Sequence, residues 1–214
     1  MQIRLNSIRA RSEVDGPGLR AVLFLQGCPL ACPGCQSRAL WPATGGYVTP
    51  VHDLALTLAT LARFNGGNIT ISGGEAFTQP AALAELVSNL RALGVKHIIV
   101  YTGYIWEQLF SVDHPARPWL KEILEGVDVL VDGRFVKELD NPYIIYRGSS
   151  NQRPIDVPAS LAAGEVVTLD WSQPELVIRE DGSLIAPEGL ALELAEMGWV
   201  HHARMCGSVV SHAG

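Results

Sequence analysis

The sequence predicts an α/β fold in which a parallel sheet forms a partial barrel of about five or six βα units. Four short runs dense in Val, Ile and Leu are typical of buried parallel strands, and stretches with helical apolar spacing lie between them. Strands that alternate with helices imply right-handed βαβ units. A closed eight-unit barrel usually needs about 250 residues, whereas this chain has 214. We therefore expect an incomplete barrel whose open side admits a large substrate.

Each of the four expected strands ends close to a glycine. The strands span Ala21–Leu25, Asn68–Ile71, His97–Tyr101 and Val127–Val131, and the glycines that follow them are Gly27, Gly73, Gly103 and Gly133. Glycine permits sharp turns and a close approach of the backbone to a ligand. Because ligands of such folds collect at the carboxyl ends of the parallel strands, we expect the functional site at this edge.

Two stretches between the strands have the periodicity of helices. Ala81–Leu93 carries leucine and valine on one face, with Pro80 suited to its first turn and Gly94 to its end. Val51–Phe64 also places leucines on one face. The pattern loosens after the fourth strand, and we expect three further elements there. They are strands at Glu165–Asp170 and Leu176–Arg179 and a helix at Leu190–Met197.

Composition and charge narrow the class of protein. With 48% apolar residues the chain can bury one core, and we expect a single domain over residues 1–214 with its core at about 13–180. Its apolar stretches end well before the ~18 residues of a membrane span, and the N-terminus lacks the apolar run of a secretion signal. A net charge of −6 argues against nucleic-acid binding. We therefore expect a cytoplasmic protein that binds neither a membrane nor nucleic acid.

Three of the four cysteines lie within eight residues, in the segment Cys28-Pro-Leu-Ala-Cys32-Pro-Gly-Cys35. Cysteines spaced this closely, without an export signal, favour metal ligation in a reducing compartment over disulfides. Three thiolates are one fewer than a closed zinc or iron–sulfur site requires, so one metal position is free for another ligand. The sequence therefore predicts a metal centre with an open position.

A structural zinc site is the alternative for these cysteines, and the chain would then be a non-catalytic metal-binding interaction module. The distant residues that could complete such a site are Cys206, His201 and His202. Zinc sites commonly pair two separated clips of closely spaced cysteines, and this sequence has one such clip. We therefore favour the iron–sulfur interpretation, and we interpret the two histidines as a surface pair.

The cysteine spacing, placed directly after the first strand, resembles the signature of the radical S-adenosylmethionine superfamily. A second match, Ile71-Ser-Gly-Gly-Glu75, closes the second strand and resembles the superfamily's Gly-Gly-Glu motif, which contacts the amino group of the methionine moiety. Two glycines let backbone carbonyls approach an ammonium group with no Cβ in the way. The resemblance implies the partial barrel of that superfamily, a [4Fe–4S] cluster and S-adenosylmethionine.

Three further segments narrow the resemblance to the anaerobic ribonucleotide reductase activating proteins, over roughly residues 13–155. They are Asp15-Gly-Pro-Gly-Leu-Arg20, Val129-Leu-Val-Asp-Gly-Arg-Phe135 and Arg147-Gly-Ser-Ser-Asn-Gln-Arg153. The resemblance implies an oxidoreductase that cleaves S-adenosylmethionine reductively and abstracts a glycine Cα hydrogen from a partner. That partner would be a glycyl-radical enzyme, here an anaerobic ribonucleotide reductase, and the electron donor would be of flavodoxin or ferredoxin type.

The same likeness implies a set of site residues, without identifying a catalytic side chain. The cluster ligands are Cys28, Cys32 and Cys35. The adenosine side is flanked by Gly34 and Gln36, and the methionine side is flanked by Gly73, Gly74 and Glu75. Further cofactor contacts are Thr102, Asp132 and Arg134. For Thr102 and Asp132, a role in a local turn or a salt bridge is equally compatible with the sequence.

The chain departs from many members of that family after the third cysteine, where Gln36-Ser37 replaces an aromatic residue followed by Asn. The departure leaves cluster ligation intact and bears on the adenine contact. A small-molecule radical S-adenosylmethionine enzyme similar to 7-carboxy-7-deazaguanine synthase, which shares a short barrel, is the alternative enzyme. The segment Arg147–Arg153 argues against it. In that segment Arg147, Asn151 and Arg153 either bind a carboxylate or an acidic partner loop, or form a solvated polar turn.

Overall fold

The computed structural model describes residues 1–141 and 144–171, together with four short segments at 177–178, 184–186, 203–205 and 208–209. The chain divides into two compact units, Met1–Trp171 and Ser172–Gly214. In the second unit, four short strands form a sheet with the order β11-β10-β9-β8. They are β8 (Val177–Ile178), β9 (Leu184–Ala186), β10 (Ala203–Met205) and β11 (Ser208–Val209). The single domain expected over residues 1–214 stays a prediction.

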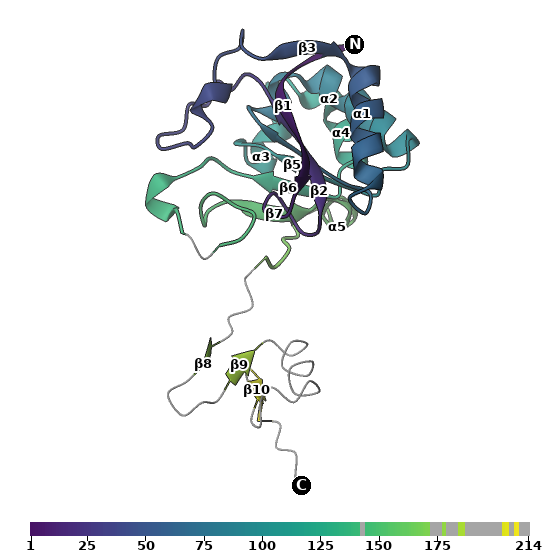
Figure 1. Ribbon diagram of the computed structural model, residues 1–214. Helices are drawn as coiled ribbons and strands as arrows, with labels where there is room; N and C mark the ends of the chain where they lie inside the picture. The colour runs from purple at the N-terminus through teal and green to yellow at the C-terminus, as the bar shows by residue number, and fades with distance from the viewer. Residues whose placement is uncertain (142–143, 172–176, 179–183, 187–202, 206–207, 210–214) are drawn as a thin grey trace. The chain divides into compact units, whose positions relative to one another are not determined.

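The first unit is built on a seven-stranded sheet with the order β3-β1-β2-β4-β5-β6-β7 (Figure 1). Its strands are β1 (Gln2–Ser12), β2 (Arg20–Leu25), β3 (Tyr47–Pro50), β4 (Asn68–Gly73), β5 (His97–Tyr101), β6 (Val129–Asp132) and β7 (Arg153–Asp156). The central strands β2, β4, β5 and β6 are parallel, and β1, β3 and β7 pair antiparallel to their neighbours. The predicted α/β fold with a parallel sheet is confirmed. Within the described residues, four parallel strands with antiparallel extensions stand in place of the five or six βα units that we expected.

Helices cover one face of this sheet, with α1, α2 and α4 grouped on the same side in Figure 1. The α-helices are α1 (Val51–Arg63), α2 (Pro80–Ala92), α3 (Trp106–Leu109), α4 (Leu120–Glu125) and α5 (Val157–Ala163), and the 3₁₀ helices are Arg38–Leu40, Ala76–Thr78, Arg117–Trp119 and Lys137–Leu139. The predicted helices 51–64 and 81–93 correspond to α1 and α2. Their leucines pack with Leu23, Ile69 and Ile98 of the central strands in one large core. In the part of the chain that the structure describes, none of the helices is long and apolar enough to cross a membrane.

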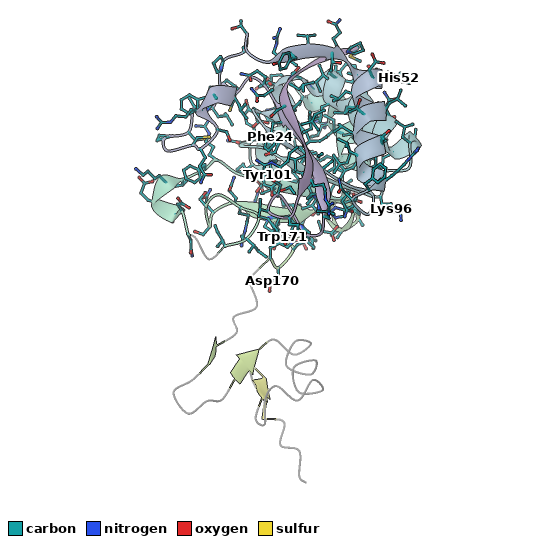
Figure 2. The ribbon with its side chains drawn as sticks, in the orientation of Figure 1. Phe24, His52, Lys96, Tyr101, Asp170 and Trp171 are labelled. Carbon is teal, nitrogen blue, oxygen red and sulfur yellow. The ribbon has the colours of Figure 1, made fainter. Side chains whose placement is uncertain are left out.

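The other face of the sheet carries a smaller apolar cluster. Ile99, Val129, Val131 and Trp171 are buried there, and Tyr101 packs beside them. Figure 2 labels two residues of this cluster, Tyr101 and Trp171. The Tyr101 hydroxyl donates to the carbonyl of Tyr146 (2.6 Å), so the loop before β7 is fixed over this face. The face of the sheet opposite the long helices is thus partly covered by residues that follow β6.

Of the two strands expected beyond β6, the first differs from the prediction and the second is found in part. The segment 165–170 runs beside β7, where the Leu169 amide donates to the Pro154 carbonyl (2.7 Å), but it makes only an isolated bridge between Thr168 and Ile155. The expected strand 176–179 contains β8, which belongs to the sheet of the second unit. The expected helix 190–197 and the residues Cys206, His201 and His202 lie outside the described residues.

Arg20 is completely buried at the start of β2. Its hydrogen bonds give several residues of the segment 15–20 a structural role. Its Nε donates to Thr70 Oγ1 (2.6 Å) and its Nη1 to the Pro17 carbonyl (2.5 Å). The Thr70 hydroxyl in turn donates to the Asp15 carbonyl (2.8 Å). Burial lowers the pKa of Arg20 to about 10, since desolvation disfavours the charged guanidinium. The guanidinium therefore holds the loop before β2 against β4.

The protein is expected to lose stability in acid through His97, which lies 3.3 Å from the Arg20 guanidinium through its Nδ1. Burial lowers the pKa of His97; Asp128 opposes this shift, and Arg20 and Arg91 reinforce it. The unfolded state then binds the proton more readily, so the unfolding free energy falls as pH falls below about 6.5. Denaturant unfolding of a His97→Gln variant should show a weaker loss over this range, whereas His52→Gln, on the exposed side of α1, should follow the wild type. Equal acid sensitivity of His97→Gln and the wild type would contradict this assignment.

Candidate functional site

The carboxyl ends of the four parallel strands meet at one edge, and backbone hydrogen bonds join the loops that leave it. The Glu75 amide, after β4, donates to the Gly27 carbonyl, after β2 (2.8 Å). The Gly133 amide, after β6, donates to the Tyr104 carbonyl, after β5 (3.1 Å). The expectation that the glycine turns line a common edge is therefore confirmed, and the cysteine segment begins at this edge.

The cysteine loop is closed at its base by the segment that contains Leu40 and Trp41. The Gly27 and Cys28 amides donate to the carbonyls of Leu40 (2.8 Å) and Trp41 (3.0 Å). Within the loop, the Cys35 amide donates to the Cys32 carbonyl (3.1 Å), which makes a tight turn between the two thiols. Cys28, Cys32 and Cys35 are half-buried free thiols.

This set of donors fits an iron–sulfur cluster. Thiolates are the ligands that hold such clusters, and three of them leave one iron available to another molecule. Burial raises the pKa of the Cys28 thiol, while the backbone amides of Leu30 and Ala31 act in the opposite direction, so bonding to iron is what would keep this sulfur deprotonated. Among the described residues, no three His, Cys, Asp or Glu side chains are gathered closely enough to hold a metal ion.

Glu75 is completely buried beside this loop, and its carboxylate joins the ends of β4 and β5. Oε1 accepts hydrogen bonds from the Phe77 amide (3.0 Å) and from the Thr102 hydroxyl (2.8 Å), and Oε2 accepts one from the Gly103 amide (2.8 Å). Burial nevertheless raises the pKa of Glu75, because desolvation outweighs these three donors. The structure thus brings Glu75 and Thr102 into one hydrogen-bonded group.

Gly73 and Gly74 are required by the close approach of the backbone of β2 and of the turn that follows it. A Cβ on Gly73, which pairs with Leu25, would lie 2.5 Å from the Leu25 nitrogen, and the Gly73 φ of +101° also favours glycine. A Cβ on Gly74 would lie 2.4 Å from the Gly27 carbonyl oxygen. The sequence suggested that these residues are glycines because a ligand approaches the backbone there. The structure gives a second reason for glycine, which is the close packing of the end of β4 on β2 and on the turn that leads into the cysteine loop.

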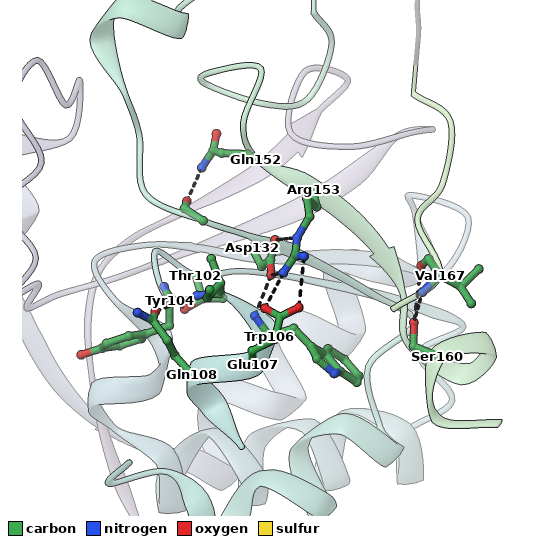
Figure 3. Close-up of polar contacts among 12 residues, drawn as sticks. Thr102, Tyr104, Trp106, Glu107, Gln108, Asp132, Gln152, Arg153, Ser160 and Val167 are labelled. Carbon is green, nitrogen blue, oxygen red and sulfur yellow. Dashed lines mark hydrogen bonds and ion pairs between the residues drawn. The ribbon is translucent and has the colours of Figure 1, made fainter. Parts of the chain in front are cut away.

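Asp132, at the end of β6, is held in an ion-pair network (Figure 3). Its completely buried carboxylate accepts hydrogen bonds from Arg153 Nε (2.9 Å) and Nη2 (2.5 Å) and from the Trp106 amide (2.7 Å). Arg153 also donates to both carboxylate oxygens of Glu107, at 3.2 and 2.9 Å. These hydrogen bonds from Arg153 lower the pKa of Glu107. The salt-bridge role that the sequence allowed for Asp132 is thus present, and a cofactor contact by Asp132 stays a prediction.

The segment Arg147–Arg153 folds onto the loop after β6. Gln152 Oε1 accepts from the Gly148 amide (2.7 Å), and Gln152 Nε2 donates to the Gly133 carbonyl (2.9 Å). Asn151 donates to the Arg134 carbonyl (2.8 Å). Arg153 and Asn151 therefore have structural roles here, and a partner-binding role for this segment stays a prediction.

The remaining predicted contacts lie on neighbouring loops. Arg134 and Gln36 are exposed, and Gly34 lies against the side chain of Lys137. Sequence reasoning missed Glu107 and Gln152, whose roles depend on contacts between distant segments. For Gln152, the one signal in the sequence was its position within the segment Arg147–Arg153.

The fold and this edge define a class, an α/β protein with a three-thiol iron–sulfur loop at the carboxyl end of a parallel sheet. The family described as a 4Fe-4S single cluster domain matches residues 14–155. The anaerobic ribonucleoside-triphosphate reductase-activating protein of Escherichia coli K12 is 33% identical over 144 residues, which cover 65% of this chain and 89% of the relative. The pyruvate formate-lyase 1-activating enzyme of the same organism is 29% identical over 163 residues, which cover 74% of this chain and 62% of the relative. Among solved structures, QueE from Escherichia coli has a TM-score of 0.39 at 16% identity, over 62% of this chain and 70% of QueE, a likeness too weak to carry an argument.

The chain belongs to the 4Fe-4S single cluster domain family, among the radical S-adenosylmethionine enzymes that activate glycyl-radical enzymes. It is therefore an oxidoreductase, and the cofactors of this group are a [4Fe–4S] cluster and S-adenosylmethionine. The iron–sulfur interpretation of the cysteine loop, and not the zinc alternative, agrees with this membership.

Proposed function

We propose that this protein activates an anaerobic ribonucleotide reductase by abstracting a Cα hydrogen from a glycine of that enzyme. A [4Fe–4S] cluster held by Cys28, Cys32 and Cys35 would supply the electron for reductive cleavage of S-adenosylmethionine into methionine and a 5′-deoxyadenosyl group, and that group would accept the hydrogen atom. Glycine suits this step because its planar Cα radical has no side-chain crowding and is delocalised into both flanking amides. The observation that carries the proposal is the three-thiol loop packed against the buried Glu75 at the carboxyl edge.

The residues of this edge would hold and orient the reactants. We propose that Cys28, Cys32 and Cys35 bind three irons, and that the backbone of Gly73–Glu75 meets the ammonium group of the methionine moiety. Both oxygens of the Glu75 carboxylate already bond to protein groups, so its role would be to fix that backbone. Positioning the sulfonium compound beside the cluster and excluding water are what the protein adds to the chemistry of its cofactors.

The other predicted contacts would complete the binding site. Gly34 and Gln36 would flank the adenosine, and Arg134, exposed after β6, would approach the bound molecule from the neighbouring loop. Thr102 and Asp132 would act indirectly, because Thr102 holds Glu75 and Asp132 holds the Trp106 amide and Arg153. We also propose a flavodoxin- or ferredoxin-type electron donor and a cytoplasmic location, in keeping with thiolate ligation in a reducing compartment.

The choice of partner rests on how much of each relative is matched. The match covers 89% of the reductase-activating protein but 62% of the pyruvate formate-lyase 1-activating enzyme. The nearly full-length match to the first relative favours a partner of the kind that its name gives, whereas more than a third of the second relative lies outside the match.

Anaerobic reconstitution with iron and sulfide should load about four irons per chain, and reduction followed by addition of S-adenosylmethionine should release 5′-deoxyadenosine. With an anaerobic ribonucleotide reductase present, electron paramagnetic resonance should detect a glycyl radical on that enzyme. Pyruvate formate-lyase in the same assay tests the choice of partner. A fully loaded protein that releases no 5′-deoxyadenosine would exclude the proposed reaction, and one zinc per chain would point to a metal-binding module instead.

A further inference from the structure

The cysteine loop contacts the rest of the edge through a side chain that lies between its first two thiols. Leu30 points onto Gly103, which follows β5. A Cβ on Gly103 would lie only 2.3 Å from Leu30 Cδ1, so the leucine occupies the space that a larger residue would need. Gly103 has no unusual positive φ, so the reason for glycine here is the space that the end of the Leu30 side chain fills, and an added Cβ would push that end aside. The Leu30 side chain therefore packs directly on the Cα of Gly103.

Gly103 also takes part in the hydrogen bonds that hold the Glu75 carboxylate. The Gly103 amide donates to Glu75 Oε2, and the position of a Cβ on Gly103 lies 3.6 Å from that same oxygen. One residue thus supports the cysteine loop with its bare Cα and holds the buried carboxylate with its amide. A shift of the Leu30 backbone away from Gly103 would therefore change the position of the cysteine loop relative to Glu75.

The far end of the loop rests on a second support. Gly34 adopts a φ of +80°, and a Cβ there would lie 3.1 Å from Lys137 Cδ and 3.2 Å from Lys137 Cβ and Cγ. Lys137 begins the 3₁₀ helix that follows β6. The aliphatic part of Lys137 therefore lies across the turn between Cys32 and Cys35, and the loop is held between the chain after β5 and the chain after β6.

We infer that Leu30 is a positioning residue, which sets the cysteine loop on Gly103 so that the cluster forms next to the strand end that carries Glu75. The inference deepens the proposed function, on which it rests. Leu30 contributes through packing: it limits how far the three thiols can move from one another in the metal-free protein and keeps the loaded cluster in register with the methionine side of the site.

Four variants test this inference: Leu30→Ala, Gly103→Ala, the double variant, and Gly126→Ala as a matched control. A Cβ on Gly126, at the end of α4, would also lie 2.3 Å from a side-chain atom, Val87 Cγ1. Gly126→Ala therefore introduces a clash of the same size away from the cysteine loop. The readouts are the alkylation rates of Cys28, Cys32 and Cys35 in metal-free protein, and the rate of iron loss to a chelator from reconstituted protein.

We expect Leu30→Ala and Gly103→Ala each to raise both rates roughly tenfold, a size usual for side chains in contact, while Gly126→Ala stays near the wild type. The double variant should be no worse than either single variant, because both substitutions remove the same contact. Rates equal to those of Gly126→Ala, or additive effects in the double variant, would overturn the inference. If the wild type fails to bind iron, the proposed function fails, and the alkylation rates still decide the role of Leu30.

Discussion

Replacing Cys32 with serine is expected to abolish cluster binding and, with it, cleavage of S-adenosylmethionine. The loop offers three thiolates for a cluster that already leaves one iron to another molecule, so it has no sulfur to spare. A serine hydroxyl stays protonated at neutral pH and is a poor ligand for iron in such clusters. The loss should exceed the roughly 10- to 100-fold effects that follow changes behind the metal ligands. The measurements are iron and sulfide content, and the absorbance of the four-iron cluster after anaerobic reconstitution.

Ser37→Ala is the matched control for Cys32→Ser. The Ser37 amide donates to the Cys35 sulfur (3.4 Å), and alanine keeps this amide, so the control should retain its cluster. Cys32 is half-buried and makes no core contact, so the metal-free Cys32→Ser protein should unfold at the same denaturant concentration as the wild type. Four-iron absorbance in Cys32→Ser would show that the cluster has other ligands.

The central strands were predictable because they are buried on both faces. The predicted strand 97–101 coincides with β5, and the other three strands are found with shifts of one or two residues. A strand covered on both faces reads as a continuous apolar run, which few other structures produce. The helices α1 and α2 were predictable for a related reason, since each buries one regular face against the sheet.

The antiparallel strands β1 and β7 were missed for physical reasons as well. In β1, charged and polar residues alternate with Ile3 and Leu5, and about half of the strand is exposed, so its apolar signal is weak. In β7, Pro154 argues against a strand, but β7 lies at the edge of the sheet, where a missing amide donor is tolerated. A strand that is only partly buried has a more polar sequence pattern than one buried on both faces.

The candidate site also has features that the sequence predicts and features that only the folded structure shows. The thiols were found from spacing within eight residues, and the Gly-Gly-Glu segment from its place at the end of a strand. The contacts that organise the edge join residues far apart in the chain: Glu75 with Gly103, Asp132 with Arg153, and Leu30 with Gly103. Spacing cannot reveal such pairs, because they exist only after the parallel strands bring their ends together.

Removing the charge of Arg153 is expected to have the largest effect on stability. Arg153→Met would leave the carboxylate of Asp132 buried with the Trp106 amide as its remaining donor among those described above. Breaking a buried pair in this way costs about 3–5 kcal/mol, and the lower end applies here because the Arg153 side chain is 34% exposed. Denaturant unfolding of the metal-free protein at neutral pH measures this change in the free energy of unfolding.

Two further variants separate the buried carboxylate from the exposed one. Glu107→Gln should cost less than about 1 kcal/mol, because the Glu107 side chain is 54% exposed and water replaces its partner. Adding Asp132→Asn to Arg153→Met should recover part of the lost stability, since an uncharged amide tolerates burial better than an unpaired carboxylate. If Arg153→Met unfolds like the wild type, or if Asp132→Asn worsens it, then the buried charge of Asp132 does not depend on Arg153. In that case the turn after β6, which carries Gly133 and Arg134 to the candidate site, must be held in place by other contacts.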